Sequence, residues 1–359
     1  MGATLPETRL HLMTRTTPTA LWNDSCSAEE LRLSIDQNGA TGATCNPVIV
    51  LYVLKKEASR WTERIGQLVR ERPSAGDREI AWALVEEMSL RAAELLVPTF
   101  ARHNGTSGRL SIQTDPSLYR DSRAMVGQAL RFHALAPNMI VKIPATSAGI
   151  QAIEEATYRG VSINATVSFT VPQAIAVAEA VERGLERRHR EEQDITRMGP
   201  VCTLMVGRLD DWLKLDAEKR NIITNPEVLD WAGVAVMKKA YRIYRERGYR
   251  LRLLSAAFRH HRHWSEFIGG DVVISPPYLW QERYNASDVE VKARMEEPVP
   301  DTIREELYSK LEDFRHAYDE NGLTPSGFDS YGATRKTLRQ FCAAVDELVV
   351  RVRNVMLPE

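Results

Sequence analysis

Short apolar or alternating runs recur along the chain, and stretches with apolar residues at helical spacing separate them. Eight runs have the length of a strand: TALWND (19–24), GATCN (42–46), RLSIQTD (109–115), MIVKIP (139–144), VSINATVSF (161–169), PVCTLMV (200–206), LRLLSAAF (251–258) and DVVISP (271–276). The stretches between them often stop at glycine, where a left-handed helix cap costs least. Eight strand–helix repeats predict an α/β fold with a parallel sheet closed into a (β/α)8 TIM barrel.

Three segments depart from this repeat. Residues 52–104 carry two extra helical patterns between the second and third predicted strands, and the charged segment 182–199 is typical of a solvated helix end and loop. Residues 299–359 form a helical tail. We therefore expect a barrel domain over 1–298, which contains the insertion, and a C-terminal helical extension over 299–359 that packs on it.

The amino-acid composition limits the kinds of partner and the cellular environment that we expect for the protein. The 359 residues include 47 Lys and Arg against 48 Asp and Glu, so the net charge of -1 gives no overall field for nucleic acid or an anionic membrane. No run approaches the roughly 18 apolar residues of a transmembrane helix, and the segment 1–20 lacks the apolar stretch of a secretory signal. The four cysteines form no C-x-x-C pair, which favours a soluble protein in a reducing cytoplasm.

Lys142 is the first candidate for chemistry, because it stands inside the otherwise apolar run MIVKIP. Burying an ammonium is costly, so such a lysine either pairs with a carboxylate or has a lowered pKa. A lysine with a lowered pKa is a nucleophile that can form a Schiff base with a carbonyl. The alternative is a lysine that reaches solvent at a strand end or serves in a structural ion pair.

The next predicted strand carries a row of polar residues. Alternation puts Asn164, Thr166 and Ser168 on one face, where they can face the barrel interior near Lys142. Such groups can hold a polyhydroxylated substrate or a water for proton transfer. Alternatively, each merely satisfies backbone or solvent, as serines and threonines in strands often do.

Polar residues also stand near the carboxyl ends of the first three predicted strands, where a barrel places its active site. Asp24 and Asn46 close the first and second runs, and Gln113 shares a face of the third with Asp115. An aspartate there can move the proton of a substrate hydroxyl, as carbon–carbon cleavage beside a hydroxyl requires. For Asp24 the alternative is a helix N-cap, and for Asp115, before Pro116, a cap or turn is the better interpretation.

Two arginines, Arg208 and Arg259, follow the sixth and seventh predicted strands. Loops late in a barrel commonly bind phosphate, and a guanidinium suits phosphate bidentately, although a plain surface arginine is the commoner case. The run RHHRH (259–263) suggests a metal site, but the interleaved arginines repel a cation and no Asp, Glu or Cys cluster lies near in sequence. No nucleotide-binding glycine motif occurs.

Together these segments resemble a known family. GATGATCNP (39–47) resembles the Thr-(Ser/Thr)-Asn-Pro signature of the transaldolases, IVKIPAT (140–146) with GIQAI (149–153) resembles the segment around their Schiff-base lysine, and GVSINAT (160–166) resembles the strand after it. FDSYGAT (328–334) is similar to the tail of bacterial members. The resemblance covers most of the chain from about 20 to 280, and the fructose 6-phosphate aldolases are close kin of the same family.

The resemblance implies a cofactor-free and metal-free enzyme of carbohydrate metabolism, of the kind that serves the pentose phosphate pathway. It implies that Lys142 is the Schiff-base lysine, that Asp24 is the acid/base for carbon–carbon cleavage, and that Thr166 helps to position a catalytic water. The residues implied to hold the substrate hydroxyls and phosphate are Asn46, Asn164, Thr203, Arg208 and Arg259.

Several positions depart from the family pattern. Where transaldolases usually place a glutamate in the third strand, this chain has Gln113, as the fructose 6-phosphate aldolases do. An amide can orient a water but cannot accept and return its proton. The family serine before the second arginine is Ala257, the serine of the sixth strand is Thr203, and the neighbouring aromatic is Met205. These changes suggest a reshaped pocket and a non-standard sugar phosphate.

The leading hypothesis is transfer of a three-carbon dihydroxyacetone unit from a ketose phosphate to an aldose phosphate through a Schiff base on Lys142. Because of Gln113, cleavage that releases dihydroxyacetone stays an alternative. A non-catalytic sugar-phosphate binding protein and a metal-dependent barrel enzyme using residues 260–263 are the further alternatives. Small sugar phosphates are the expected partners, and the protein is expected to be a monomer or homodimer.

Overall fold

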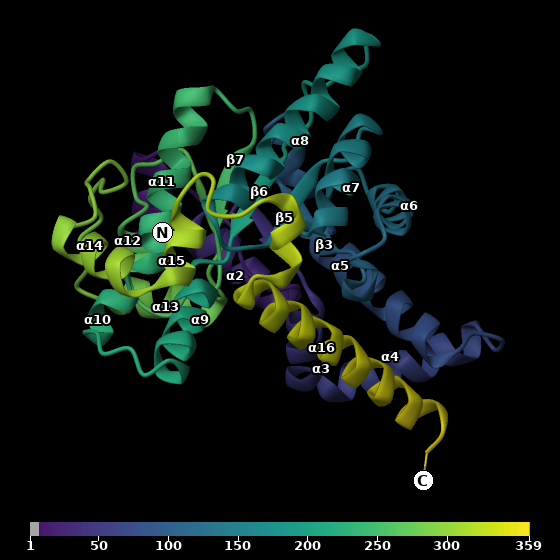
Figure 1. Cartoon of the computed structure of the whole chain (residues 1–359). Helices are drawn as coiled ribbons and strands as arrows, with labels where there is room; N and C mark the ends of the chain where they lie inside the picture. Colours follow the sequence, from purple (N-terminus) through teal and green to yellow (C-terminus); the bar gives the residue numbers. More distant parts are fainter. Residues whose placement is uncertain (1–6, 359) are drawn as a thin grey trace.

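The computed structural model describes residues 7–358, in which eight parallel strands form a nearly closed barrel surrounded by helices (Figure 1). Residues 1–6, the start of the N-terminal segment considered above, and residue 359 lie outside the described residues. The strands are β1 Ala20–Leu21, β2 Gly42–Thr44, β3 Arg109–Gln113, β4 Met139–Pro144, β5 Ile163–Ser168, β6 Val201–Leu204, β7 Arg252–Ser255 and β8 Val273–Ile274. Each falls within one of the predicted runs, which confirms the (β/α)8 barrel.

The sheet order β1-β8-β7-β6-β5-β4-β3-β2 leaves β1 and β2 to close the barrel. A parallel bridge joins Asn23 to Ala43, and the Asn23 amide donates to the Gly42 carbonyl at 2.9 Å. All strand pairs are parallel, so every strand ends at the same mouth of the barrel. This shared mouth brings together residues that are distant in sequence.

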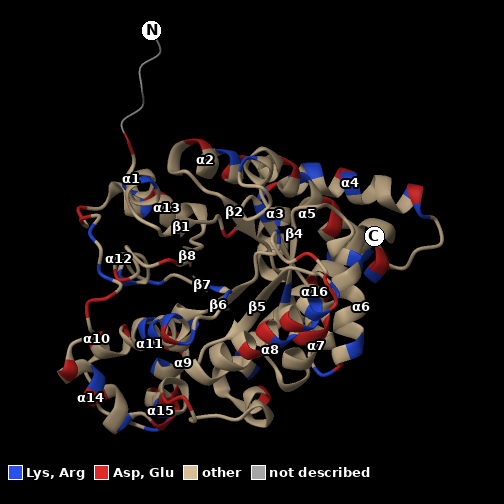
Figure 2. Cartoon of the chain, turned by 90° about the horizontal axis from the view of Figure 1, so that it is seen from above, with Lys and Arg blue, Asp and Glu red and all other residues tan. Residues whose placement is uncertain are grey.

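Helices cover the outside of the barrel, with basic and acidic residues interspersed over them (Figure 2). They are α1 Arg9–Thr16, α2 Ala28–Asn38, α3 Pro47–Lys56, α4 Ala58–Glu71, α5 Asp77–Arg102, η1 Pro116–Leu118, α6 Ser122–His133, α7 Ser147–Tyr158, α8 Val171–Arg190, α9 Val206–Lys219, α10 Pro226–Leu229, α11 Ala232–Arg247, α12 Arg262–Ser265, α13 Tyr278–Ala286, α14 Asp301–Lys310, α15 Glu312–Tyr318, η2 Pro325–Ser330 and α16 Gly332–Met356. Within the described part of the chain, no helix is long and apolar enough to cross a membrane.

The lower part of the barrel interior is an apolar layer. The interior side chains of this layer are Trp22, Ile140, Val201, Leu254, Ala256 and Val273. Gly42 makes room for the largest of them, since a Cβ there would lie 2.5 Å from the Trp22 indole. Polar interior positions lie above this layer, at Lys142, Asn164 and Thr203.

The segments outside the eightfold repeat are helical. α4 and α5 supply the two extra helices of the insertion between β2 and β3, and α8 extends to Arg190 before the charged loop. The tail forms α14, α15, η2 and the long α16. α16 lies beside α3 and α4 (Figure 1), and it also contacts α5, α9, β5 and η1. It therefore reaches the carboxyl-end mouth, where η1 follows β3 and α9 follows β6.

Candidate active site

Lys142 lies on β4 in the barrel interior, directly above the apolar layer. In the strand register it lies beside Gln113 of β3 and Asn164 of β5, and its side chain is only 4% exposed. Burial lowers the pKa of the Lys142 amine, and the Asp24 carboxylate opposes that shift in part. The expectation of a buried lysine with a lowered pKa is thus supported, and a lysine that reaches solvent is excluded.

Asp24 follows β1 and is held at the mouth by a neighbouring strand. The Thr44 hydroxyl of β2 makes a short hydrogen bond to the Asp24 carboxylate, and Thr44 also lies 3.2 Å from the Ser275 hydroxyl. Burial raises the pKa of Asp24, although Lys142 and the Thr44 hydrogen bond act in the opposite direction. The helix-cap interpretation of Asp24 is wrong, because α2 begins after Ser27 and Asp24 turns to Thr44 instead.

Asn164 joins three strands through its amide. Its Nδ2 donates to the Ser111 hydroxyl of β3 at 2.9 Å, and its Oδ1 accepts from the Thr203 hydroxyl of β6 at 2.7 Å. All three side chains are buried. The bond to Ser111 passes across β4, whose inward-facing residues are Ile140 and Lys142. Asn164 is therefore fixed beside the lysine, and Thr203 acts as its anchor.

The polar row predicted on β5 is interrupted by a bulge. The pairing register shifts between Ala165 and Ser168, and Val167 adopts a left-handed backbone with φ of 51°. Ser168 pairs with Leu204, and because the neighbouring Thr203 faces Asn164 in the interior, Leu204 and Ser168 lie on the outer face. The expectation that Ser168 shares the interior face is wrong, whereas Thr166, paired with Pro144, stays on the face of Lys142.

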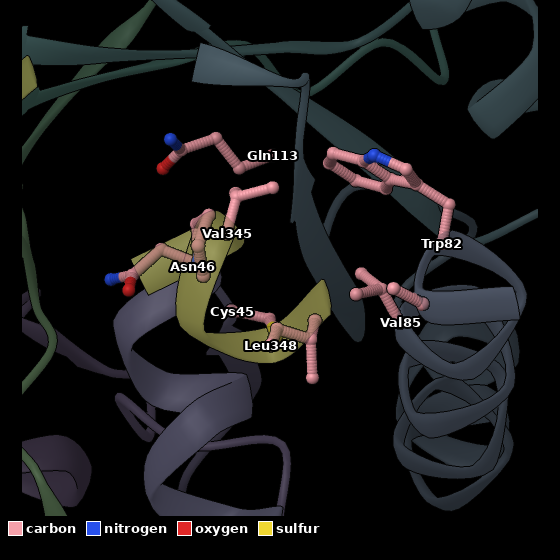
Figure 3. Close-up of a pocket in the computed structure, with 9 residues that line it drawn as sticks. Cys45, Asn46, Trp82, Val85, Gln113, Val345 and Leu348 are labelled. Atoms are coloured by element: carbon pink, nitrogen blue, oxygen red, sulfur yellow. The ribbon is translucent and has the colours of Figure 1, made fainter. Parts of the chain in front are cut away.

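Gln113 and Asn46 stand at one edge of the mouth (Figure 3). Asn46 caps α3 by accepting a hydrogen bond from the Ile49 amide at 3.0 Å, and Gln113 Oε1 is buried with no hydrogen-bond partner among the described residues. In Figure 3 both amide groups point the same way, away from Trp82 and Val85. Val345 and Leu348 of α16 line the same narrow pocket. An unpartnered buried oxygen beside Lys142 is a place for a water or a substrate hydroxyl.

Asp115 does not belong to this group. Its carboxylate accepts from the Ser117 amide at 2.9 Å at the start of η1, and Arg78 forms an ion pair with it at 2.5 Å. The cap or turn interpretation is therefore confirmed.

Arg208 and Arg259 lie at the same mouth, after β6 and β7. Arg208 donates to Thr337 Oγ1 at 3.4 Å and to Gln340 Oε1, both on α16, and its guanidinium lies 5.2 Å from the Phe341 ring centroid. Burial, together with the charge of Arg259, lowers the pKa of Arg208 to about 10. The positive charges of the two guanidinium groups therefore act on each other.

Arg259 is exposed and already has a carboxylate partner. Its Nη2 lies 2.7 Å from Asp211 Oδ2. Asp211 is three positions after Arg208 on α9, so both arginines are tied to one helix. The charge of Arg259 is therefore already balanced by the Asp211 carboxylate.

The histidines after β7 have a partner that the sequence did not indicate. His263 Nε2 lies 2.8 Å and His260 Nε2 lies 3.3 Å from Asp210 Oδ2. No cluster of Asp, Glu or Cys lies near the histidines in sequence, but α9 brings Asp210 to them in space. The geometry still does not suit a metal: His263 Nδ1 accepts from the Arg259 amide at 3.2 Å, so the ring proton is on Nε2, where a metal would have to bind.

Sequence reasoning missed several residues of the mouth. Ser111 was detectable, because it alternates with Gln113 along β3, and Thr44 alternates with Asn46. Asp211 and Gln340 had no such signal, since each acts on an arginine of another segment. The structure brings the polar residues predicted on or after β1 to β7 to the same mouth of the barrel. Asp115 and Ser168 are the exceptions.

The site thus consists of an interior lysine, a nearby carboxylate and an amide fixed by hydrogen bonds. These features place the chain in the class of (β/α)8 barrel proteins that carry a polar site at the carboxyl ends of the strands. The chain belongs to the transaldolase/fructose-6-phosphate aldolase family, whose model matches residues 21–349. It is 33% identical over 236 residues to a protein named transaldolase from Thiobacillus denitrificans, a match over 63% of this chain and 64% of that protein.

A transaldolase of Mycobacterium tuberculosis is 29% identical over 234 residues, which is 63% of this chain and 62% of that protein. A transaldolase of Mycobacterium marinum shows the same 29% identity and the same coverage. The chain thus matches less than two thirds of the length of these relatives.

Proposed function

We propose that the protein transfers a three-carbon dihydroxyacetone unit from a ketose phosphate to an aldose phosphate through a Schiff base on Lys142. The observation that carries the proposal is the place of Lys142, buried on the barrel interior with Asp24 near it. A neutral amine is the form that attacks a carbonyl, and burial favours that form. Membership of the transaldolase family supports the same chemistry.

The steps follow from the groups at the mouth. The Lys142 amine adds to the ketose carbonyl, and loss of water gives the iminium, which draws electrons from the adjacent carbon–carbon bond. Asp24, with its raised pKa, takes the proton of the β-hydroxyl as that bond breaks and the aldose leaves. The enamine that remains on Lys142 adds to the aldehyde of the acceptor, the proton returns, and water releases the product.

Fixed polar groups explain how such a substrate is held. Asn164 cannot turn, because Ser111 and Thr203 occupy its two ends, and its position beside Lys142 suits contact with the substrate. Arg208 and Arg259 form a local cation pair for the terminal phosphate in a chain whose net charge is only -1. Local binding of the phosphate therefore does not need a basic protein.

Gln113 favours a second reaction of the same site. Its unpartnered amide oxygen can accept a hydrogen bond from a water, but the amide cannot take up the proton. Cleavage that releases dihydroxyacetone is the reaction of the fructose 6-phosphate aldolases, which carry glutamine at this place. We therefore keep aldol cleavage as the alternative, with the same lysine and the same aspartate.

Borohydride trapping tests the proposal. The protein is incubated with fructose 6-phosphate and borohydride, and its intact mass and peptide map are measured. A three-carbon adduct on Lys142 is expected, and Lys142→Met is the matched control that must show none. Binding of the sugar phosphate without any adduct would instead select a non-catalytic binding protein.

An acceptor distinguishes the two reactions. With an aldose phosphate present, transfer predicts a new ketose phosphate, and free dihydroxyacetone stays low. Dihydroxyacetone that accumulates at the same rate with and without acceptor would select the aldolase. A reducing cytoplasm is the proposed compartment, supported by four free cysteines among the described residues.

A further inference from the structure

Two adjacent aspartates of α9 hold the same residue, Arg259, by different routes. Asp211 binds the guanidinium directly, with 2.7 Å between Nη2 and Oδ2. Asp210 acts through His263: its Oδ2 lies 2.8 Å from His263 Nε2, and His263 Nδ1 accepts from the backbone amide of Arg259 at 3.2 Å. One route fixes the charge of the arginine, and the other fixes its backbone.

The route through His263 is entirely buried. Asp210 and His263 are both 0% exposed, and the second carboxylate oxygen of Asp210 accepts from the Gly233 amide at 2.8 Å, in the first turn of α11. Burial alone would raise the pKa of Asp210, but hydrogen bonds from His260 and His263 outweigh it and bring the pKa to about 2. The carboxylate is therefore ionised and oriented.

The hydrogen bonds set the tautomer of His263. A backbone N–H can only donate, so Nδ1 facing the Arg259 amide must carry the lone pair. The proton is then on Nε2, where it points at the Asp210 carboxylate. Burial lowers the pKa of His263 against the pull of Asp210, which agrees with a neutral ring.

The segment that carries Arg259 lies tightly against the segment that carries Arg208. Ala257 has a left-handed backbone with φ of 66°, which costs energy for a residue with a side chain. Its carbonyl packs on Gly207, where an added Cβ would lie 1.9 Å from that oxygen. A shift of the Arg259 backbone would therefore change the spacing of the two guanidinium groups.

We propose that His263, oriented by Asp210, is a positioning residue that fixes Arg259 beside Arg208 and so sets the affinity for the phosphate end of the substrate. The inference rests on the proposed function for the identity of the substrate. The geometry of the anion site can be tested without that identity, because inorganic phosphate probes the same two arginines.

Three variants separate the two ends of the His263 ring. His263→Gln can keep a donor to Asp210 but has no acceptor for the Arg259 amide. His263→Asn can keep that acceptor and loses the contact with Asp210. Asp210→Asn presents an NH2 group to His263 Nε2, and this donor favours the tautomer with its proton on Nδ1. The Nδ1–H group then faces the backbone N–H of Arg259, so two donors meet and the hydrogen bond is lost.

The measurements are the Kd for inorganic phosphate and the KM and kcat with fructose 6-phosphate and with unphosphorylated fructose. For His263→Gln and Asp210→Asn we expect about tenfold weaker phosphate binding and a similar rise in KM for fructose 6-phosphate, the effect of one lost hydrogen bond. Turnover of fructose should be unchanged. His263→Asn should weaken phosphate binding by less than about threefold.

Nitrogen-15 NMR adds a signature that a merely structural role would not move. The shifts of the His263 ring should show Nδ1 unprotonated in the wild type and protonated in Asp210→Asn. His316→Gln is the matched control, since His316 lies 3.5 Å from Asp313 on the exposed surface of α15, and it should change none of these quantities. Thermal unfolding verifies each fold, and the isosteric Asp210→Asn carries the test if the His263 variants do not fold.

The outcomes separate this inference from the proposed function. Equal loss of activity with fructose and fructose 6-phosphate, unchanged phosphate affinity in folded variants, or no phosphate binding by the wild type would overturn the positioning role. Failure to trap any adduct on Lys142, together with phosphate binding that weakens as expected, would overturn the proposed reaction and leave the positioning role intact.

Discussion

Gln113 and Lys142 are register partners on β3 and β4, so the amide that departs from the transaldolase pattern stands directly beside the buried lysine. Its oxygen has no hydrogen-bond partner within residues 7–358, and the amide points away from the apolar side of its pocket (Figure 3). In the proposed mechanism, the water that enters and leaves during Schiff-base formation passes close to this group. Substitutions of Gln113 are therefore the best way to compare group transfer with aldol cleavage.

Gln113→Glu is expected to speed Schiff-base formation and hydrolysis by at least about tenfold, because a carboxylate can accept and return the proton of the water. The measurement is the rate of borohydride-trapped adduct against time. Gln113→Leu, which cannot bind the water, serves as the control and should be slower than the wild type. A glutamate variant no faster than the wild type would remove Gln113 from the proton path.

Lys142→Met is expected to abolish adduct formation and turnover while the fold remains. The methionine fills a similar volume and removes an ammonium that burial penalises, so the free energy of unfolding should not fall by more than about 1 kcal/mol. Thermal unfolding and peptide mapping check both statements. Retained turnover in this variant would contradict the assignment of the lysine.

The pH dependence of trapping should follow the lowered pKa of Lys142. The neutral amine is the reactive form, so the trapping rate should rise with pH and reach its plateau below the ordinary lysine value of 10.5. Initial rates measured from pH 5 to 10 would check this. A rate that still rises as steeply at the upper end of the range would show an unshifted lysine.

The free energy of unfolding should also depend on pH in the range in which Lys142 titrates. Between the lowered pKa of folded Lys142 and 10.5, the unfolded chain binds more protons than the folded chain, so the free energy of unfolding rises with pH there. Asp24 acts in the opposite sense, because its raised pKa lets the folded chain hold a proton above 3.8 that the unfolded chain releases. Denaturant unfolding of the wild type and Lys142→Met at several pH values should show that the lysine variant loses the rise.

Thr203→Val is expected to lower kcat/KM by about tenfold and stability by about 1–3 kcal/mol, because it leaves the buried Asn164 oxygen without its donor. Steady-state kinetics and denaturant unfolding measure the two effects. Thr203→Ser keeps the hydroxyl and should restore most of both. If the serine variant were as impaired as the valine variant, packing of the threonine methyl would be the cause, and the hydrogen bond to Asn164 would not.

The sequence by itself determined the barrel and the chemistry-bearing strands. The apolar run MIVKIP, the period of two in INAT and the helical periods between the runs indicate the strands, the helices and the residues that share a face, and these signals depend only on neighbouring residues. For that reason Lys142, Gln113 and Asn164 were predicted and lie beside one another in the register. The alternation of side chains predicted the wrong face where the backbone departs from regular strand geometry, as at the bulge of β5 that places Ser168 on the outer face.

Only the tertiary structure decided which groups meet at the mouth. Arg208 is held by Gln340, 132 residues away, and His263 by Asp210, 53 residues away. Asp24 begins no helix, because Thr44 of the neighbouring strand binds its carboxylate. Hydrogen bonds of this kind form between segments that the closed barrel brings together, and no periodicity along the chain records them, because the spacing of the partners in sequence is set by the helices between the strands.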